Sequence, residues 1–442
     1  MFSARAISIG ALFLAALSSM AATLTVGAGK EYSRIEEALA ASQSGDRIEI
    51  YPASGNGIYL VPAIYVTKSN LTFVGMEGRP ILDGTGFNYS GIGSTPRAIF
   101  QINQGANGVT IENLELRGAH NDSHNGAGVR INQGNQAVIR RCTIHNNDMG
   151  IMSNGNGSDP SSASGQMIEF CSIYFNGDIS NPGFNHNLYL GGSDATVRFC
   201  DIHDSLTGHN LKSRAHFNLL QYNFIHDSAN RELDLVDAWD TSRQNSHAVL
   251  MGNLIVKKLN MSGNRGVIHF GQDGSGHHDG TLYLLNNTIV TSYVSDVVQL
   301  STAPSAAVII NNVIFNGSQS FPSLFSLASG LQPSAVSGDH NWISSGYSLQ
   351  GSMIDPGSRY QGSAIGSDPG FQNLARGQFF LAKTSERYGV NSAPQFLDGA
   401  GVNLSAIPAF QYRPVASRTP IGWASRMYLG AGIQRPVGQG GH

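Results

Sequence analysis

Charged residues are scarce in this chain of 442 residues. Lys and Arg together number 27 and Asp and Glu number 30, so only 13% of the residues carry a charge. That shortage disfavours a protein built mainly of helices, in which Lys and Glu would fill the exposed faces. The formal net charge of -3 gives no reason to expect nucleic-acid binding. Glycine is abundant instead, with 53 residues, and favours tight turns because it tolerates left-handed backbone.

Long apolar runs are also rare. The main candidate lies at the N-terminus, where Arg5 precedes the apolar stretch AISIGALFLAAL and Ser19-Met20-Ala21 fits a small-x-small cleavage site. This pattern predicts a signal peptide over residues 1–22 and a secreted or periplasmic mature protein. The run is too short for a membrane span and no later stretch is long enough, so no membrane attachment is expected after cleavage.

Cysteine is rare as well, with three residues in the whole chain. An odd number cannot pair completely within one exported chain, which leaves at most a single disulfide between neighbours. Cys142, Cys171 and Cys200 are 29 residues apart at each step (171 − 142 and 200 − 171). This regular spacing indicates a structural repeat, in which the cysteines are interpreted as small buried fillers of a stacked ladder.

The repeat continues after the third cysteine. The cysteine segments read IRRCTIHNN, IEFCSIYFN and VRFCDIHDS, and later segments read LQYNFIHDS, LMGNLIVKK, LLNNTIVTS and IINNVIFNG. The cysteine position is then taken by Asn223, Asn253, Asn287 and Asn312. Short alternating segments between turns of variable length predict a solenoid of β coils. Equivalent residues would stack about 4.8 Å apart, with the asparagine side chains hydrogen bonded to one another.

The stacked coils, the asparagine ladder and the N-terminal stretch TLTVGAGKEYSRIEEALAASQSGDRIEIYP resemble right-handed parallel β-helix proteins of the pectate-lyase type. Within that stretch Ile35, Ala38, Leu39 and Ala41 share one helical face, and the resemblance implies that this helix caps the solenoid. The predicted fold class is all-β, a right-handed parallel β-helix with an N-terminal capping helix. The predicted divisions are a signal peptide (1–22), an N-terminal cap (23–62), coils (63–345) and a closing segment (346–442).

Two neighbouring coils carry the candidate site. The segments NHNLYLGGSDATVRFCDIHD and GHNLKSRAHFNLLQYNFIHD share a frame in which His186 matches His209 and Tyr189 matches Lys212, 23 residues apart (209 − 186 and 212 − 189). The leucines of this frame are predicted to point inward. Tyr189, Lys212 and, two residues later, Arg214 would then point outward on one sheet face.

The following coils add further polar residues, and Asp234 is expected to stack on Lys212. These residues are Arg231, Glu232, Asp234, Asp237 and His269. A groove along a solenoid is a natural site for an extended polymer. A solvated polar face is the alternative explanation of the cluster, and a structural ladder is the alternative for His186 and His209. His145, His203 and His226 share one frame position and are interpreted as structural.

β-Elimination on a uronic-acid polymer needs a base for the C5 proton, a cation for the adjacent carboxylate and an acid for the departing O4 oxygen. Lys212, with its pKa lowered by Arg214, is the predicted base, and Tyr189 is the predicted acid. Arg214 would bind the substrate carboxylate through two hydrogen bonds. His209 is a further catalytic candidate. The resemblance to β-helix lyases of alginate and related uronates implies the same roles for Lys212, Arg214 and Tyr189.

Substrate binding and a metal complete the prediction. His186, Arg231, Asp234 and His269 are predicted to bind the substrate, an acidic polysaccharide. Pectate lyases of this fold carry calcium on several acids, so the resemblance implies a Ca²⁺ site on Glu232, Asp234 and Asp237; Asp-rich structural turns are the alternative. A monomer is expected because a capped solenoid has no exposed edge.

Two other functions stay open beside the favoured secreted polysaccharide lyase. A glycoside hydrolase would use Asp234 and Asp237 as its pair of carboxylates. A non-catalytic β-helix would bind a glycan or another partner without changing it. The chemistry of the product separates the three, because only a lyase leaves an unsaturated sugar.

Overall fold

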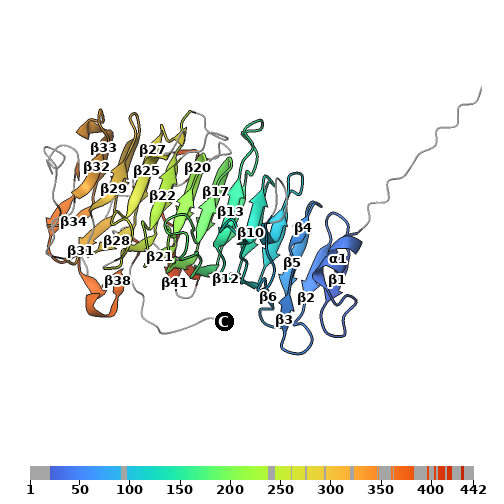
Figure 1. The fold of residues 1–442 in the computed structure, drawn as a ribbon. Helices are drawn as coiled ribbons and strands as arrows, with labels where there is room; N and C mark the ends of the chain where they lie inside the picture. The colour runs from blue at the N-terminus through green and yellow to red at the C-terminus, as the bar shows by residue number, and fades with distance from the viewer. Residues whose placement is uncertain are drawn as a thin grey trace, which may run out of the picture.

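The structure, a computed structural model, is a stack of short β-strands wound around one apolar interior (Figure 1). It describes residues 20–90, 97–236, 244–259, 261–273, 276–292, 295–318, 323–345, 347, 360–361, 363–382, 396–397, 403–404, 407–413, 416–420 and 430–432. Within these ranges, three long sheets are built from strands that pair in parallel with the equivalent strand of the next coil. The predicted all-β class and the parallel β-helix are confirmed.

Each sheet collects one short strand from successive coils. The 13-stranded sheet contains, in spatial order, β1 (Thr23–Val26), β2 (Arg47–Ile50), β5 (Thr72–Gly75), β8 (Thr110–Glu112), β11 (Val138–Arg140), β14 (Gln166–Glu169), β17 (Asp194–Arg198), β20 (Phe217–Gln221), β23 (Ala248–Met251), β27 (Thr281–Leu285), β30 (Ala306–Ile310), β33 (Val336–Asp339) and β35 (Tyr360–Gln361). The 12-stranded sheet contains β3 (Ile58–Leu60), β6 (Ile81–Asp83), β9 (Glu115–Arg117), β12 (Thr143–His145), β15 (Ser172–Tyr174), β18 (Asp201–His203), β21 (Phe224–His226), β24 (Leu254–Val256), β28 (Thr288–Thr291), β31 (Val313–Asn316), β34 (Trp342–Ser344) and β36 (Ala364–Gly366).

The 11-stranded sheet carries the candidate site. Its strands are β4 (Ile64–Val66), β7 (Ala98–Ile102), β10 (Ala127–Asn132), β13 (Met149–Asn154), β16 (Leu188–Leu190), β19 (Leu211–Ser213), β22 (Leu233–Val236), β25 (Ile268–Asp273), β29 (Asp296–Leu300) and β32 (Ser323–Leu327), with β26 (Gly276–His277) antiparallel to β25. Leu188, Leu211 and Leu233 stack on one another and are fully buried, as the frame predicts. The residue after each of these leucines therefore points outward.

Outside the three sheets, the described chain forms short hairpins and helical turns. The hairpins pair β37 (Phe371–Asn373) with β38 (Gln378–Leu381), β39 (Phe396–Leu397) with β40 (Asn403–Leu404), and β41 (Phe410–Arg413) with β42 (Ser417–Pro420); the 3₁₀ turns cover Pro333–Ala335 and Leu374–Arg376. Tyr222 accepts a hydrogen bond from the backbone N–H of Ala409 at 3.0 Å, which joins the last hairpin to the coils.

An amide ladder runs along the bend between the 13-stranded and 12-stranded sheets. Nδ2 of Asn223 donates to Oδ1 of Asn253 at 3.0 Å, and Asn253 donates to Asn287 in the same way at 3.0 Å. Cys142, Cys171 and Cys200 continue the line as buried free thiols, so the predicted ladder is confirmed. The residue before each ladder position takes left-handed backbone, which produces the sharp bend; examples are Arg141, Phe170, Phe199 and Tyr222, with φ of 55°, 55°, 57° and 55°.

A second ladder lies at the bend that precedes the 11-stranded sheet. Nδ2 of Asn176 donates to Asn187 at 2.9 Å, and Nδ2 of Asn187 donates to Asn210 at 2.8 Å. Asn210 in turn donates to Oε2 of Glu232 at 2.6 Å, so Glu232 ends the line. The asparagines of the repeated His-Asn-Leu frame thus set the register of the strands that follow them.

The helix predicted near the N-terminus is present as α1 (Ile35–Ala41), beside β1 in Figure 1. Its residues Ile35, Ala38 and Leu39 are buried, and its role as a cap stays a prediction. Strands already join the sheets within residues 23–62 and again after residue 345, so the stack reaches beyond the predicted coil limits at both ends. Nearly all of the predicted signal peptide lies outside the described residues. None of the described helices is long and apolar enough to cross a membrane.

Replacing one rung of the first ladder tests its contribution to stability. Asn253→Ala removes the acceptor of Asn223 and leaves the backbone carbonyl of Leu220 without its 2.8 Å donor. Because buried polar groups lose their partners, we expect the free energy of unfolding to fall by about 3 kcal/mol. The measurement is a denaturant titration followed by circular dichroism. Asn181→Ala, in a loop, is the matched control, and an equal loss in both variants would contradict the assignment.

Candidate functional site

The outward face of the 11-stranded sheet carries one continuous line of side chains, called the outward row below. Strand register places Tyr189 beside Lys212, Lys212 beside Asp234, and Asp234 beside His269. The predicted stacking of Tyr189, Lys212 and Asp234 is confirmed and His269 extends it, whereas the chemical roles of these residues stay predictions. From the N-terminal end, the row consists of Tyr65, Gln101, Arg130, Met152, Tyr189, Lys212, Asp234, His269, Gln299 and Ser326.

Lys212 is held between two carboxylates in the row. Its Nζ donates to Oδ2 of Asp234 at 2.8 Å and to Oδ2 of Asp273 at 2.6 Å, and the residue is only 9% exposed. Asp273 lies at the end of β25, where its backbone pairs with Gly276 of β26. The carboxylate of Asp273 therefore reaches Lys212 from the end of β25, beyond the residues of this strand that pair with β22, and Asp273 is not itself a member of the row.

Arg214 shares the carboxylate of Asp273 with Lys212. Its Nη2 donates to Oδ2 of Asp273 at 2.7 Å, and its Nε donates to the hydroxyl of Tyr189 at 2.9 Å. A single carboxylate oxygen thus accepts from an ammonium and a guanidinium. The structure brings Tyr189, Lys212 and Arg214 together, as the repeated frame predicts.

The predicted lowering of the Lys212 pKa by Arg214 is wrong. Burial alone would lower this pKa, but the charges and hydrogen bonds of Asp234 and Asp273 raise it above the ordinary lysine value. The charge of Arg214 is itself balanced by Asp273. Lys212 is therefore an ammonium ion in this arrangement, which does not suit a general base at neutral pH.

Asp234 connects the centre of the row to its C-terminal part. Its Oδ1 accepts from Nδ1 of His269 at 2.6 Å and from Arg231 at 3.3 Å, while Arg231 also donates to Gln299 at 2.7 Å. Burial would raise the pKa of Asp234, but the His269 hydrogen bond and the surrounding positive charges hold it well below its ordinary range. Asp234 is consequently ionised and cannot donate a proton.

His269 continues from Asp234 to a hydroxyl, with Nε2 at 2.6 Å from Oγ of Ser301. Carboxylate, imidazole and hydroxyl follow one another in serine hydrolases in this order. Here Oγ of Ser301 also accepts a hydrogen bond from the backbone N–H of Gln272 at 2.9 Å, and Asp234 is shared with Lys212. These hydrogen bonds from Ser301 through His269 therefore hold the carboxylate of Asp234 in place against Lys212.

His186 and His209 form a stacked pair with ring centroids 5.0 Å apart. Nδ1 of His186 accepts from the backbone N–H of His209 at 2.9 Å, and both rings are buried. Burial lowers the pKa of His209 to about 4 and that of His186 well below its ordinary value, so both rings are neutral near pH 7. Nε2 of His209 lies 3.6 Å from Asp234. This geometry matches the ladder explanation of the pair, and direct contact with substrate stays a prediction.

The predicted calcium ligands have different surroundings. The carboxylate of Glu232 is fully buried at the end of the second ladder, where it accepts from the backbone N–H of Ser228 at 3.0 Å and from Asn210. Burial raises the pKa of Glu232 to about 7, against the charge of Lys257. Asp234 already binds Lys212 and His269, and Asp237 lies outside the described residues. A calcium ion would therefore have to displace existing donors from Asp234.

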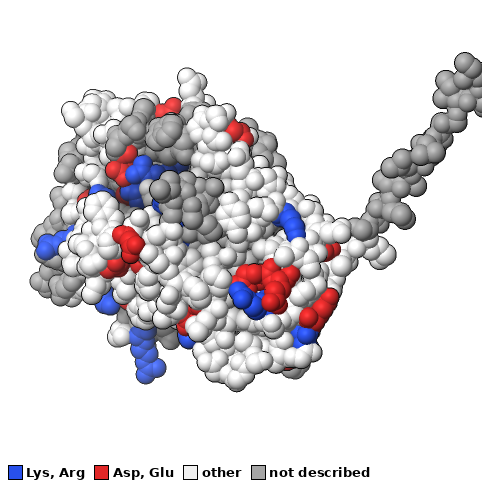
Figure 2. All heavy atoms as spheres, turned by 45° about the vertical axis from the view of Figure 1, so that its right-hand side comes forward, with Lys and Arg blue, Asp and Glu red and all other residues white. Residues whose placement is uncertain are grey.

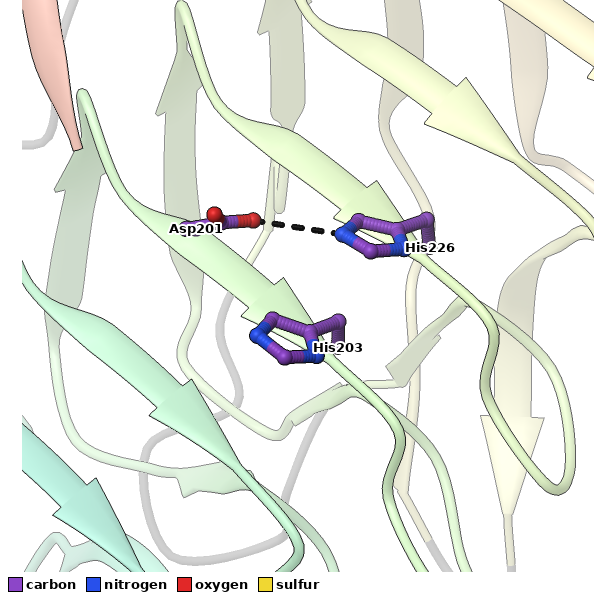
Figure 3. Close-up of side chains that lie close together, drawn as sticks. All are labelled: Asp201, His203 and His226. Atoms are coloured by element: carbon purple, nitrogen blue, oxygen red, sulfur yellow. Dashed lines mark hydrogen bonds and ion pairs between the residues drawn. The ribbon is translucent and has the colours of Figure 1, made fainter. Parts of the chain in front are cut away.

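A different cluster has metal-ligating atoms close together. Asp201, His203 and His226 each offer one such atom, all within 4.8 Å of one another, on the 12-stranded sheet (Figure 3). The two imidazoles stack with centroids 4.8 Å apart, and His226 lies between Asp201 at 3.2 Å and Asp227 at 2.9 Å. Because His226 already has an acid at each nitrogen, the stack agrees with the structural role predicted for these histidines.

Comparison with known proteins defines the class of fold. No protein-family model matches the chain, and no curated protein matches it. Among solved structures, the chain is similar to pectate lyase Pel9A, with 13% identity, a TM-score of 0.54, and 90% of this chain and 98% of that chain covered. Further similar structures are an alginate lyase from Paenibacillus sp. str. FPU-7 (14% identity, TM-score 0.45, 70% and 99% covered) and a tailspike protein of E. coli bacteriophage HK620 (11%, 0.47, 76% and 61%). At 13% identity, the likeness to pectate lyase Pel9A shows a shared fold alone.

Sequence reasoning missed the bridging position of Asp273 and the extent of the row. Asp273 is six residues after the inward residue Val267, where β25 turns back to pair with β26. The repeated sequence frame does not contain this turn, so it gives no position for Asp273. The place of Gln299 in the row could have been predicted from the sequence. Gln299 lies 30 residues after His269 (299 − 269), and the same number of residues separates Ile268 from Val298.

The His226 stack gives a pH-dependent stability. Burial alone would lower the pKa of His226, but hydrogen bonds to Asp201 and Asp227 raise it from 6.5 to about 9. The stabilisation is complete below the unfolded value of 6.5 and is lost as pH rises through about 9; a shift of this size corresponds to roughly 3 kcal/mol. We expect His226→Gln to lower the melting temperature strongly at about pH 6 and much less at about pH 10. If His226→Gln lowered the melting temperature equally at both pH values, the conclusion that this ring is charged in the folded protein would be wrong.

Proposed function

We propose that this protein is a polysaccharide lyase that cleaves a uronic-acid-containing polysaccharide by β-elimination along the outward row. One observation carries the proposal: Lys212 and Arg214 converge on one carboxylate oxygen of Asp273, at 2.6 and 2.7 Å, while Arg214 also binds the hydroxyl of Tyr189. Two cations on one carboxylate beside a phenol are the groups that elimination from a uronate requires. The fold is compatible with this activity and with others.

In the proposed complex, the carboxylate of a uronic acid takes the place of the Asp273 carboxylate. The Asp273 side chain is 43% exposed, so it can leave without unpacking the core. Lys212 and Arg214 then neutralise the charge that builds on the substrate carboxylate when the C5 proton departs. The planar guanidinium of Arg214 also orients the sugar, since it can donate two parallel hydrogen bonds.

Tyr189 is assigned the proton transfer. The C5–H bond breaks, a double bond forms between C4 and C5, the C4–O4 bond breaks, and O4 receives a proton. The hydroxyl of Tyr189 gives its own proton to O4 and takes the proton from C5, so the phenol is regenerated and the step balances without another donor. Lys212 supplies charge in this scheme, which replaces the predicted role as base because its pKa is raised.

In the hydrolase alternative, Asp234 would be the ionised carboxylate and not the general acid. A glycoside hydrolase needs one protonated carboxyl beside an ionised one, and the depressed pKa of Asp234 leaves it ionised. Its predicted partner Asp237 lies outside the described residues. Non-catalytic glycan binding remains the second alternative, and it uses the same cations without a proton-transfer group.

Export and calcium dependence belong to the proposal as separate parts. Analysis of the N-terminus of protein secreted by the native host tests cleavage within residues 20–23. For calcium, activity is measured after EDTA treatment and again after adding Ca²⁺. A loss that Ca²⁺ restores would support the site on Glu232 and Asp234, whereas an unchanged rate would remove calcium from the proposal.

Variants at the two central residues test the roles. Purified mature protein is assayed on alginate, polygalacturonate and glucuronan by the ultraviolet absorbance of the unsaturated product. We expect Tyr189→Phe and Lys212→Ala to lower kcat by about 100-fold or more, because one loses the proton carrier and the other a preorganised charge. Lys212→Arg keeps the charge and should stay within about tenfold of the wild-type rate.

The outcomes separate the two assignments for Lys212. If Lys212→Arg is as inactive as Lys212→Ala while both proteins remain folded by circular dichroism, Lys212 acts as the base and the charge role is wrong. If Tyr189→Phe keeps full activity, the proton transfer belongs elsewhere. New reducing ends without an unsaturated sugar would replace the lyase by a hydrolase.

Asp273 gives an independent prediction. Asp273→Asn removes the carboxylate that competes with the substrate for Lys212 and Arg214, so we expect KM for the polymer to fall about threefold to tenfold with kcat nearly unchanged. The measurement is steady-state kinetics at low ionic strength, where charge interactions are least screened. A large loss of kcat would instead mean that Asp273 itself takes part in the reaction.

A further inference from the structure

A hollow of about 500 Å³ opens on the N-terminal part of the same sheet face. Its lining includes Tyr65 and Arg130 of the outward row and five side-chain amides, those of Asn103, Gln104, Asn132, Gln133 and Asn154. Register continues without interruption from Arg130 through Met152 and Tyr189 to Lys212. Three strand spacings separate the hollow from the central lysine, which is roughly 14 Å.

Arg130 has no acidic partner among the described residues. Its Nη atoms meet only amide oxygens, those of Gln101, Asn132 and Asn154 at 3.5, 3.2 and 3.4 Å, and its Nε has no hydrogen-bond partner. The residue is 9% exposed, and burial together with the charge of Arg97 lowers its pKa to about 10. Arg130 is still charged near pH 7, so a buried positive charge lies beside an open hollow with no counterion in the part of the chain that the structure describes.

Several other cations of this chain are balanced by acids. Arg140, Arg198 and Lys212 bind carboxylates at 2.7, 2.8 and 2.8 Å, and Figure 2 shows basic and acidic side chains next to one another in a few patches of a mostly uncharged face. Burying a charged group is costly unless an opposite charge compensates it. A ligand carboxylate in the hollow would supply that compensation for Arg130.

We propose that this hollow is a distal subsite for a carboxylate-bearing sugar of the same polymer whose cleavage is proposed at Lys212, on which the inference therefore rests. Arg130 binds the sugar carboxylate through its guanidinium. The amides of Asn103, Asn132 and Asn154 bind hydroxyl groups, and the ring of Tyr65 borders the sugar. The polymer then lies along the outward row, with a few sugar units between the hollow and the bond that breaks.

The experiment compares Arg130→Gln with Arg47→Gln in the full mature protein. Arg47 is on β2 of the 13-stranded sheet, so its variant removes the same charge at a remote site. Kinetics are measured by the unsaturated product on long uronate chains and on a purified trisaccharide that is too short to reach the hollow. Binding is measured separately by retardation in gels that contain alginate, polygalacturonate or glucuronan, which does not require cleavage.

We expect Arg130→Gln to raise KM for the long chain by about tenfold or more, because a charge-assisted hydrogen bond is lost, with kcat and the trisaccharide kinetics unchanged. Gel retardation should weaken in the same variant and not in Arg47→Gln. The subsite would be overturned if Arg130→Gln and Arg47→Gln had the same KM for long chains. It would also be overturned if Arg130→Gln raised KM for the trisaccharide as much as KM for long chains.

The two proposals fail in different ways. If the wild-type protein forms no unsaturated product but Arg130→Gln alone loses retardation, the lyase is wrong and the subsite stands. If the wild-type protein cleaves and Arg130→Gln matches Arg47→Gln, only the subsite is wrong. Should Arg130→Gln not fold, Arg130→Lys and Asn154→Ala replace it: each should raise KM for long chains by a smaller factor, and unchanged KM in both would overturn the subsite.

Discussion

Parallel register between successive coils is the constraint on which the rest of this structure depends. Backbone pairing places equivalent residues one strand spacing apart, and the two amide ladders fix which residues are equivalent at each bend. Coil length varies through insertions in the loops, but the ladder asparagines and the inward leucines realign every strand. Side chains far apart in sequence therefore become neighbours along a straight line.

The site follows directly from this stacking. Tyr189, Lys212, Asp234 and His269 come from four consecutive coils, and none of them would meet another without the register. Their closeness also determines their charge states: Asp234 is ionised because cations surround it, and Lys212 is protonated because acids do. Although the chain has few charged residues, several of them lie together on this sheet face. The free-energy cost of burying these charges is offset because each lies beside an opposite charge.

Much of this architecture is readable from the sequence, because the ladder and the leucines repeat. Equal spacing of the cysteines and the shared His-Asn-Leu frame predict the stack and place Tyr189 on Lys212. The pKa of Lys212 was predicted in the wrong direction, since it depends on Asp273, which arrives from an irregular connection that has no repeat. Glu232, the predicted calcium ligand, occupies the ladder position of Asn210, 22 residues earlier (232 − 210), and this position was not predicted because an acid replaces the repeated asparagine.

The most direct test of the central claim is the fate of solvent oxygen in the cleaved polymer. The reaction of the wild-type protein with alginate, polygalacturonate or glucuronan is run in heavy-oxygen water, and the products are weighed by mass spectrometry. Elimination predicts fragments that carry no solvent oxygen from the cleavage and whose new non-reducing end is lighter by one water. A heavy oxygen on the new reducing end, together with a new non-reducing end that has lost no water, would contradict elimination and assign the outward row to hydrolysis.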